Sequence, residues 1–320
     1  MRALTFSHFG GPDVLDYRDL PDPVLRPGHA IVALEAIGLN FADLYRRRGQ
    51  YHRAGTPPYI AGYEGAGRIV ALADDQSLFA VGDRVAFADS PHAQAELALV
   101  HMDHLIPLPD DIGSDTAAAL LLQGLTAQYL VRDSHLLKAG ETALVHAAAG
   151  GVGLLLVQMA RAAGARVIGL TSSPQKAEAA QRAGAGEVLL YDSAWVSAVL
   201  ELTGGGVDVA YDAVGRTLMQ SFEAVRTGGQ VVFYGMAGGD PPLVDPRLLM
   251  DTSKTLTGGD LWNVLRRPED RRERAAELFE QVRSGALTVQ VAARFPLRDG
   301  AAAHRLLESR QSSGKVLLLP

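Results

Sequence analysis

The alternation of strand-like and helix-like runs over residues 115–234 constrains the fold more than any other feature. The strand-like runs are short and apolar, and longer runs with helical spacing of apolar residues lie between them. Parallel strands need a long crossover, which is usually a helix. The alternation therefore predicts an α/β domain with a doubly wound parallel sheet. The predicted strands are 142–146, 166–170, 187–191, 207–212 and 230–234, and the predicted helices are 115–133, 152–163, 174–183, 194–203 and 218–225.

The rest of the chain has a different texture. Before residue 120, glycine and proline break the sequence at short intervals, and β-rich runs lie between them at 30–36, 67–73 and 84–88. This pattern is typical of an irregular, mostly antiparallel domain. After residue 264 we predict a charged helix at 268–284 and a β-rich stretch that ends at 315–319. Because the run 266–274 mixes both signs of charge, we interpret it as a solvated helix face.

The strongest chemical signal is the turn between the first predicted strand and its helix. Residues 142–153 read TALVHAAAGGVG, so Ala148-x-Gly150-x-x-Gly153 joins a strand to an apolar helix. Small residues at these positions let the backbone approach a pyrophosphate, which binds at the N-terminus of the helix. In this strand–turn–helix context the pattern predicts dinucleotide binding by Ala148, Gly150, Gly151, Val152 and Gly153.

The residues after the second strand indicate which dinucleotide is bound. Proteins selective for NAD usually place a carboxylate there to hold the ribose 2′-hydroxyl. This chain has Thr171, Ser172 and Ser173 instead, followed by Lys176. Hydroxyl groups and an ammonium suit a 2′-phosphate, because a charge-assisted hydrogen bond is worth roughly 1.5–3 kcal/mol. We therefore predict NADP(H) as the cofactor; the alternative is that Lys176 is a solvated residue of the next helix.

Composition narrows the chemistry. The chain has no cysteine, which excludes disulfides, thiolate nucleophiles and zinc sites with cysteine ligands, so we predict no metal. The formal net charge is −6, so a nucleic-acid partner is not expected. Glycines interrupt the uncharged run 142–160, which we interpret as buried interior rather than a membrane span. With no export signal at the start of the printed sequence, we expect a cytoplasmic protein that acts on a small molecule.

Several longer motifs carry a family resemblance. The most specific is Gly140-Glu141-x-x-Leu144 followed by Ala148-Ala149-Gly150-Gly151-x-Gly153, Gln158 and Arg161. The others are GGP at 10–12, AIGLNFAD at 36–43, GLTA at 124–127, TGGGVD at 203–208 and YDAVG at 211–215. Over nearly the whole chain, the sequence resembles the zinc-independent branch of the medium-chain dehydrogenase/reductase superfamily, and within it the NADPH:quinone oxidoreductases related to zeta-crystallin.

The resemblance implies an architecture. A mostly β, GroES-like catalytic domain would comprise residues 1–120 and 264–320, and an NADP-binding Rossmann domain would comprise 121–263, with the active site in the cleft. Zinc-dependent members carry Gly-His-Glu where this chain has Gly62-Tyr63-Glu64, so we interpret Glu64 as a structural carboxylate. Relatives pair their Rossmann domains edge to edge, which makes a homodimer through residues 254–259 the expected assembly.

The resemblance also implies site residues. Asn40 and Tyr51 are expected to donate hydrogen bonds to the substrate oxygen, with Asp43 orienting them; for Asp43 and Tyr45, packing or capping is an alternative. The expected contacts with the nicotinamide are Tyr45, Gln123 and Thr126, and those with its carboxamide are Tyr234, Gly235 and Met236. Gly150 to Gly153 are expected at the pyrophosphate, and Ser172, Lys176 and Tyr191 at the adenosine phosphate. Arg310 and Lys315 are expected to add positive charge near the phosphates.

The absence of a metal favours one reaction over others. Reducing an isolated ketone without a metal needs a strong proton donor, whereas a quinone accepts hydride more readily because an aromatic hydroquinone forms. We therefore predict an NADPH-dependent quinone reductase. Reduction of the C=C bond of an enal or enone is the alternative reaction. An RNA-binding or structural, crystallin-like role is the alternative from another class.

Overall fold

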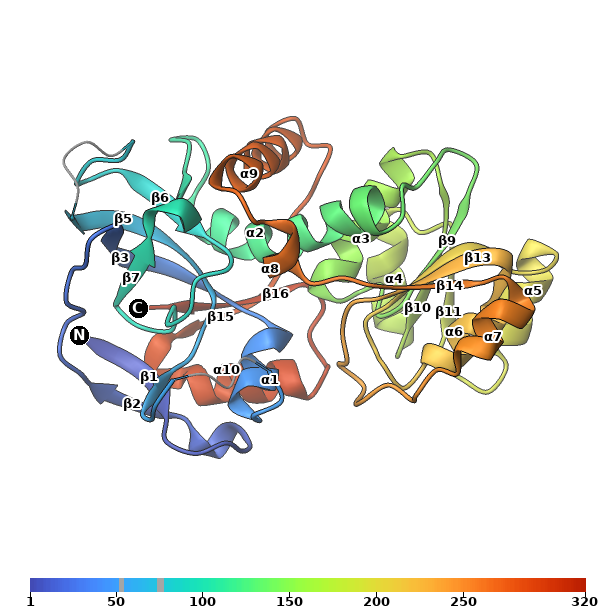
Figure 1. Ribbon diagram of the computed structural model, residues 1–320, viewed down its shortest axis with the longest axis horizontal. Helices are drawn as coiled ribbons and strands as arrows, with labels where there is room; N and C mark the ends of the chain where they lie inside the picture. Colours follow the sequence, from blue (N-terminus) through green and yellow to red (C-terminus); the bar gives the residue numbers. More distant parts are fainter. Residues whose placement is uncertain (52–54, 74–77) are drawn as a thin grey trace. The chain divides into compact units, whose positions relative to one another are not determined.

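A computed structural model of the chain describes residues 1–51, 55–73 and 78–320 (Figure 1). The chain divides into two compact units. The catalytic unit consists of residues 1–122, 265–284 and 289–320, and the nucleotide unit consists of residues 123–264 and 285–288. In the described residues, no helix is long and apolar enough to cross a membrane.

The nucleotide unit is built on a parallel sheet, which confirms the predicted fold class (Figure 1). Neighbouring strands follow the order β11-β10-β9-β12-β13-β14, and every pairing between them is parallel. The strands are β9 (Thr142–Val145), β10 (Arg166–Thr171), β11 (Glu187–Leu190), β12 (Val207–Asp212), β13 (Val225–Phe233) and β14 (Thr255–Gly258). The helices are α2 (Ser114–Tyr129), which begins in the catalytic unit, α3 (Gly151–Ala162), α4 (Pro174–Ala183), α5 (Trp195–Thr203), α6 (Leu218–Ala224), α7 (Pro246–Thr252) and α8 (Leu261–Val264).

Two helix pairs pack against this sheet. Helices α5 and α6 place Trp195 and Phe222 in a buried cluster with Leu144 and Ile168 of the strands. Helices α3 and α4 meet through Leu154 and other small apolar side chains. Apolar helix faces buried on a sheet in this way provide most of the free energy that holds such a domain together.

Strand β13 begins earlier than the sequence predicted. It starts at Val225 rather than at residue 230, and its register with β12 shifts between the pairs Val207↔Val225 and Val209↔Gln230. Gly228, at φ +73°, lies inside this irregularity. In the sequence, this glycine indicated a turn before the strand. In the structure it lies within the strand and adopts the left-handed conformation, which glycine adopts without strain.

The catalytic unit is mostly β. In one sheet the order is β15-β16-β3-β5-β6-β8, with β7 also paired to β3, and in the other it is β2-β1-β4. All described pairings are antiparallel except that of β15 with β16. The strands are β1 (Arg2–Phe6), β2 (Asp16–Asp19), β3 (His29–Leu39), β4 (Tyr59–Ile60), β5 (Glu64–Leu72), β6 (Arg84–Phe87), β7 (Leu97–His101), β8 (Ile106–Pro107), β15 (Val291–Pro296) and β16 (Lys315–Leu319).

The last third of the catalytic unit contains more helix than the sequence indicated. The predicted charged helix is α9 (Pro268–Arg283), and a further helix, α10 (Gly300–Glu308), lies within the stretch interpreted as β-rich. The first half of the unit contains the short helix α1 (Phe41–Arg47). Helix α10 buries Ala303, His304 and Leu307. Its alanine-rich start carried too little periodicity to separate it from the flanking strands.

The solvated face predicted for the run 266–274 is wrong at Arg271. This side chain is only 3% exposed, and its guanidinium donates to both carboxylate oxygens of Asp89, at 2.5 and 3.1 Å. His104 Nδ1 lies 2.9 Å from the same carboxylate. Burial opposes the charge of Asp89, but the hydrogen bonds from His104 and Arg271 hold its pKa below its usual value. The pair attaches α9 to the segment after β6.

Replacing Arg271 by leucine therefore leaves a buried carboxylate without its cation. We expect the Arg271→Leu variant to lose about 3–5 kcal/mol of unfolding free energy, measured by urea denaturation at pH 7. Arg283→Ala is the matched control, because Arg283 lies on the same helix but pairs with Asp111 at the surface. Little change is expected for this control. Equal losses in the two variants would contradict the assigned role of the buried pair.

Candidate functional site

The turn between β9 and α3 is closely packed. The chain enters it through Ala147, at φ +49°, and α3 begins at Gly151 without a side-chain cap on its first N–H groups. A Cβ atom at Gly153 would collide with the carbonyl oxygen of Ala147, and one at Gly151 would collide with the amide of Gln123. At Gly153 the clash is with backbone atoms, so only glycine allows the close approach there. The free N–H groups at the start of a twelve-residue helix form the kind of site that binds a pyrophosphate.

A hydrogen-bonded chain lies behind this turn. The Tyr191 hydroxyl accepts the N–H of Ala147 at 2.9 Å and lies 3.2 Å from His146 Nδ1. His146 Nε2 lies 3.1 Å from Ser221 Oγ, and Ser221 donates to Asp212 Oδ2 at 2.7 Å. Because Asp212 accepts, the order of donors is fixed: Tyr191 donates to His146, and His146 donates to Ser221.

Both ends of this chain lie in turns at the carboxyl edge of the sheet. Asp212 Oδ1 also accepts the N–H groups of Val214 and Gly215, which shapes the turn after β12. Burial opposes the charge of Asp212, but the hydrogen bonds from Ser221 and from the N–H groups of the turn hold its pKa below its usual value. Burial likewise lowers the pKa of His146, which keeps the imidazole neutral.

Tyr234, Gly235 and Met236 lie beside the same turn. The N–H of Tyr234 donates to the carbonyl of Asp212 at 3.0 Å, and Ala237 donates to Ala213. Of the predicted cofactor residues, the structure thus gathers the glycine turn and residues 234–236 at one edge of the parallel sheet. Gln123 and Thr126 are buried on α2, and Ala148 is buried under the turn.

Ser172 and Lys176 also come together. Ser173 caps α4 by accepting the N–H of Lys176, and Lys176 Nζ lies 3.2 Å from Ser172 Oγ at an exposed position. The predicted third member, Tyr191, is placed differently. Its hydroxyl is bound to Ala147 and His146 rather than directed to this pair, because the end of β11 faces the turn.

In the catalytic unit, Asn40 and Asp43 meet at the start of α1. Asp43 Oδ2 accepts the N–H of Asn40 at 2.7 Å, the return bond of a capping box. The Asn40 amide nitrogen donates to Glu64 at 2.8 Å and to the carbonyl of Gly38, while its oxygen accepts from Lys315 at 2.8 Å. Donation from Asn40 to a substrate would therefore require one of these bonds to be exchanged.

Lys315 is buried in this cluster, so the expectation that it adds charge at the phosphates is wrong. Its side chain is 1% exposed, and Nζ lies 2.5 Å from Glu64 Oε2. Glu64 also accepts the N–H of Leu122 at 2.7 Å, which confirms it as a structural carboxylate. A Cβ atom at Gly38 would collide with Glu64, so a glycine in β3 is what admits the carboxylate. Strand β16 pairs antiparallel with β3, and this pairing places Lys315, the first residue of β16, in the interior beside Glu64.

Tyr45 and Tyr51 are neighbours. Their rings lie 6.5 Å apart at 83°, an edge-to-face contact, and Phe41 lies 6.1 Å from Tyr45. Both tyrosines are half-buried. Tyr51 thus lies next to α1, the helix that begins with Asn40.

No metal site accompanies this cluster. Tyr63 is buried where zinc-dependent relatives would carry a histidine, and Glu64 is committed to Lys315. In the part of the chain that the structure describes, no group of three histidine, cysteine, aspartate or glutamate residues could hold a metal ion. The residues present do not fit zinc.

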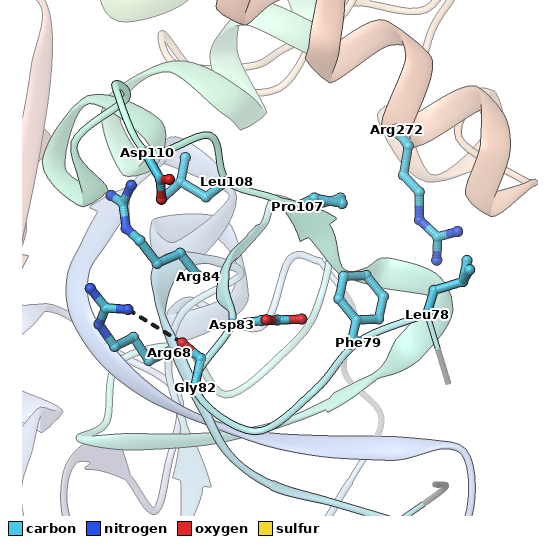
Figure 2. Close-up of a pocket in the computed structure, with 10 residues that line it drawn as sticks. All are labelled: Arg68, Leu78, Phe79, Gly82, Asp83, Arg84, Pro107, Leu108, Asp110 and Arg272. Carbon is cyan, nitrogen blue, oxygen red and sulfur yellow. Dashed lines mark hydrogen bonds between the residues drawn. The ribbon is translucent and has the colours of Figure 1, made fainter. Parts of the chain in front are cut away.

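A separate cavity of about 410 Å³ opens on the catalytic unit, and the residues that line it include none of the predicted site residues (Figure 2). Its guanidinium groups hold the surrounding backbone: Arg84 donates to the carbonyls of Pro109 and Ile112, and Arg272 to those of Met102 and Leu105. These hydrogen bonds give both guanidinium groups a structural role. Its lining residues are Arg68, Leu78, Phe79, Gly82, Asp83, Arg84, Pro107, Leu108, Asp110 and Arg272.

Sequence reasoning missed the residues that support the site. His146, Asp212 and Ser221 stand at the ends of predicted strands or in a predicted helix, and a polar side chain at the carboxyl end of a parallel strand was the available signal. Nothing in the local sequence indicated that Lys315 and Glu64 would meet, because 251 residues separate them.

Comparisons with known proteins agree with this geometry. Residues 26–140 match the alcohol dehydrogenase GroES-like domain, and residues 151–281 match the zinc-binding dehydrogenase family. A quinone oxidoreductase of Pseudomonas aeruginosa is 41% identical over 100% of this chain and 99% of its own length. A 2-haloacrylate reductase of Burkholderia is 38% identical over 97% of this chain and 96% of its own length.

A solved structure gives the same picture. The quinone oxidoreductase of Escherichia coli, complexed with NADPH, superimposes with a TM-score of 0.96 at 35% identity, over 100% of both chains. Full-length identity of this order, the shared fold and a nucleotide unit with a glycine turn place the sequence unambiguously. The chain belongs to the quinone oxidoreductase family.

Proposed function

We propose that the protein is an NADPH-dependent, zinc-independent quinone reductase. The observation that carries the proposal is the uncapped start of α3 behind a turn that only small residues can form, with Lys176 and Ser172 paired at the start of α4. Relatives named quinone oxidoreductase, one of them complexed with NADPH, match the full chain and support it.

The residues fit the cofactor. The N–H groups of Gly151, Val152 and Gly153 would hold the pyrophosphate, and Lys176 with Ser172 would hold the 2′-phosphate. Residues 234–236, with Gln123, Thr126 and Tyr45, would border the nicotinamide. When bound, NADPH supplies a hydride for a small quinone. The role of the protein is to hold the two reactants in register and keep water out.

In the catalytic unit, Tyr51, Asn40 and Asp43 are the proposed substrate-side residues. Tyr51 would donate a hydrogen bond to the quinone oxygen. The side-chain amide of Asn40 is hydrogen-bonded to Glu64 and Lys315, so it would face the substrate in one fixed orientation. Asp43 orients Asn40 through the backbone N–H.

The expected homodimer and location are part of the same proposal. Strand β14 pairs with β13 and ends the order of the nucleotide-unit sheet within the described residues, which leaves an edge for a second copy. Sedimentation equilibrium should give twice the 34.0 kDa chain mass, and a monomer would contradict it. A cytoplasmic location is expected, and cell fractionation is its test.

Two substitutions in the nucleotide unit should change cofactor binding differently. Lys176→Ala should raise the Kd of NADPH about tenfold or more and leave that of NADH unchanged, because only NADPH carries the 2′-phosphate. Tyr191→Phe should raise both Kd values by the same factor, about fivefold, because its hydroxyl supports the turn that holds the pyrophosphate. Fluorescence titration measures all four values.

Arg182→Ala is the control for Lys176→Ala. Arg182 lies on the same helix, is 69% exposed and pairs with Glu178. It should bind both nucleotides as the wild type does. If Tyr191→Phe weakened NADPH alone, the tyrosine would serve the 2′-phosphate and its assigned role in the turn would be wrong.

The reaction itself is tested with a substrate panel. Oxidation of NADPH should be fast with 1,4-benzoquinone and 9,10-phenanthrenequinone and slow with a 2-alkenal, because a quinone that accepts a hydride becomes an aromatic hydroquinone and an enal gains no such stabilisation. The reverse preference would replace the proposal with reduction of a conjugated C=C bond. Nucleotide binding without turnover of any of the three would refute both reactions.

A further inference from the structure

The buried cluster at the start of α1 contains two carboxyl groups in reach of one ammonium. Glu64 forms the ion pair with that ammonium: Lys315 Nζ lies 2.5 Å from Glu64 Oε2. Asn40 and the backbone N–H of Leu122 also donate hydrogen bonds to Glu64. Asp43 is 1% exposed, and its Oδ2 accepts the N–H of Asn40. In the described part of the chain its other oxygen, Oδ1, is buried without a hydrogen-bond partner. A buried carboxylate in that position is costly unless it takes up a proton.

The charged and titratable groups around Asp43 come from every element packed on it. Lys315 of β16 and Arg47 of α1 favour its ionised form, and Glu64 of β5 disfavours it. Tyr63, which precedes β5, interacts with Asp43 electrostatically. Burial raises the pKa of this tyrosine most, and the negative charge of Asp43 raises it further. Arg47 is itself committed to Glu308, at 2.7 Å, and to His304. Burial outweighs the cations and raises the pKa of Asp43 to about 7.

We propose that the carboxylic acid form of Asp43, with its proton on Oδ1, is well populated near neutral pH, and that it holds the proton that the reduced quinone requires. This inference rests on the proposed function and deepens it. The proposal also assigns a role to the Glu64–Lys315 ion pair. By keeping the ammonium on Glu64, the pair leaves Asp43 as the group that carries a proton.

The step balances. A quinone that accepts a hydride gains two electrons and one proton at carbon or oxygen, and becomes a hydroquinone monoanion. Asp43 loses the O–H proton from Oδ1 and becomes a carboxylate, and the monoanion gains that proton to form neutral hydroquinone. A proton from solvent then restores the acid. Because Asp43 is buried and Oδ1 has no hydrogen-bond partner among the described residues, the proton leaves when a water molecule or the substrate oxygen reaches Oδ1.

The charge state is tested without substrate. The infrared C=O stretch of a protonated carboxylic acid should appear in the protein at pH 6, disappear by pH 8.5 with a midpoint of about 7, shift on ¹³C-carboxyl labelling of aspartate, and be missing in Asp43→Asn. The asparagine keeps an acceptor for the Asn40 N–H. Glu64→Gln is the second variant: it frees Lys315 to favour the Asp43 carboxylate, so the midpoint should fall by at least about one pH unit.

Turnover is measured on the same proteins. Because the protonated form is the active one, the wild-type kcat for 1,4-benzoquinone should fall as pH rises through about 7. Asp43→Asn should lower kcat about 100-fold, lose this pH dependence and bind NADPH as the wild type does.

Each outcome decides a separate part. A missing band at pH 6, or a band that survives in Asp43→Asn, overturns the proposal. An Asp43→Asn variant that keeps the wild-type kcat and pH profile also overturns it, because the proton is then held but not delivered. A wild type that reduces no quinone refutes the proposed function instead, while the band still decides whether Asp43 carries the proton.

Discussion

The buried ammonium of Lys315 is the interaction on which the catalytic unit depends. It joins β16, β5 and the residue before α1 through contacts with Glu64 and Asn40, and a glycine at position 38 makes room for them. A buried ion pair of this kind adds little net stability, because desolvation consumes most of the attraction. Its value is positional. It fixes where Asn40 lies and, through Asn40, how α1 begins.

The nucleotide unit solves a similar problem without a cation. Asp212 is buried, and its charge is distributed over hydrogen bonds from Ser221, Thr217 and two backbone N–H groups. The chain from Asp212 to Tyr191 connects the turn after β12 with the turn before α3. Fully satisfied polar networks of this type make a structure rigid, because each member would be costly to leave unpaired. A rigid edge is what a site for an extended nucleotide requires.

Some of the site was accessible from sequence, and the physical reason is that those parts are local. The glycine turn, the parallel sheet and the Ser172–Lys176 pair each depend on residues that are close in the chain. The fold class and the identity of the cofactor followed from them. The buried positions of Arg271 and Lys315 did not, because charged side chains are usually solvated and their partners, Asp89 and Glu64, lie far away in sequence.

The sequence by itself determined the fold class, the dinucleotide turn and the exclusion of a cysteine-ligated metal, because periodicity, small-residue spacing and composition are properties of the chain alone. The tertiary structure decided the rest. It directed the Tyr191 hydroxyl to the turn, buried Lys315 against Glu64 and left Asp43 with an unpaired oxygen. These outcomes depend on which groups share one ammonium or one N–H after folding, and only contacts between distant segments settle that competition.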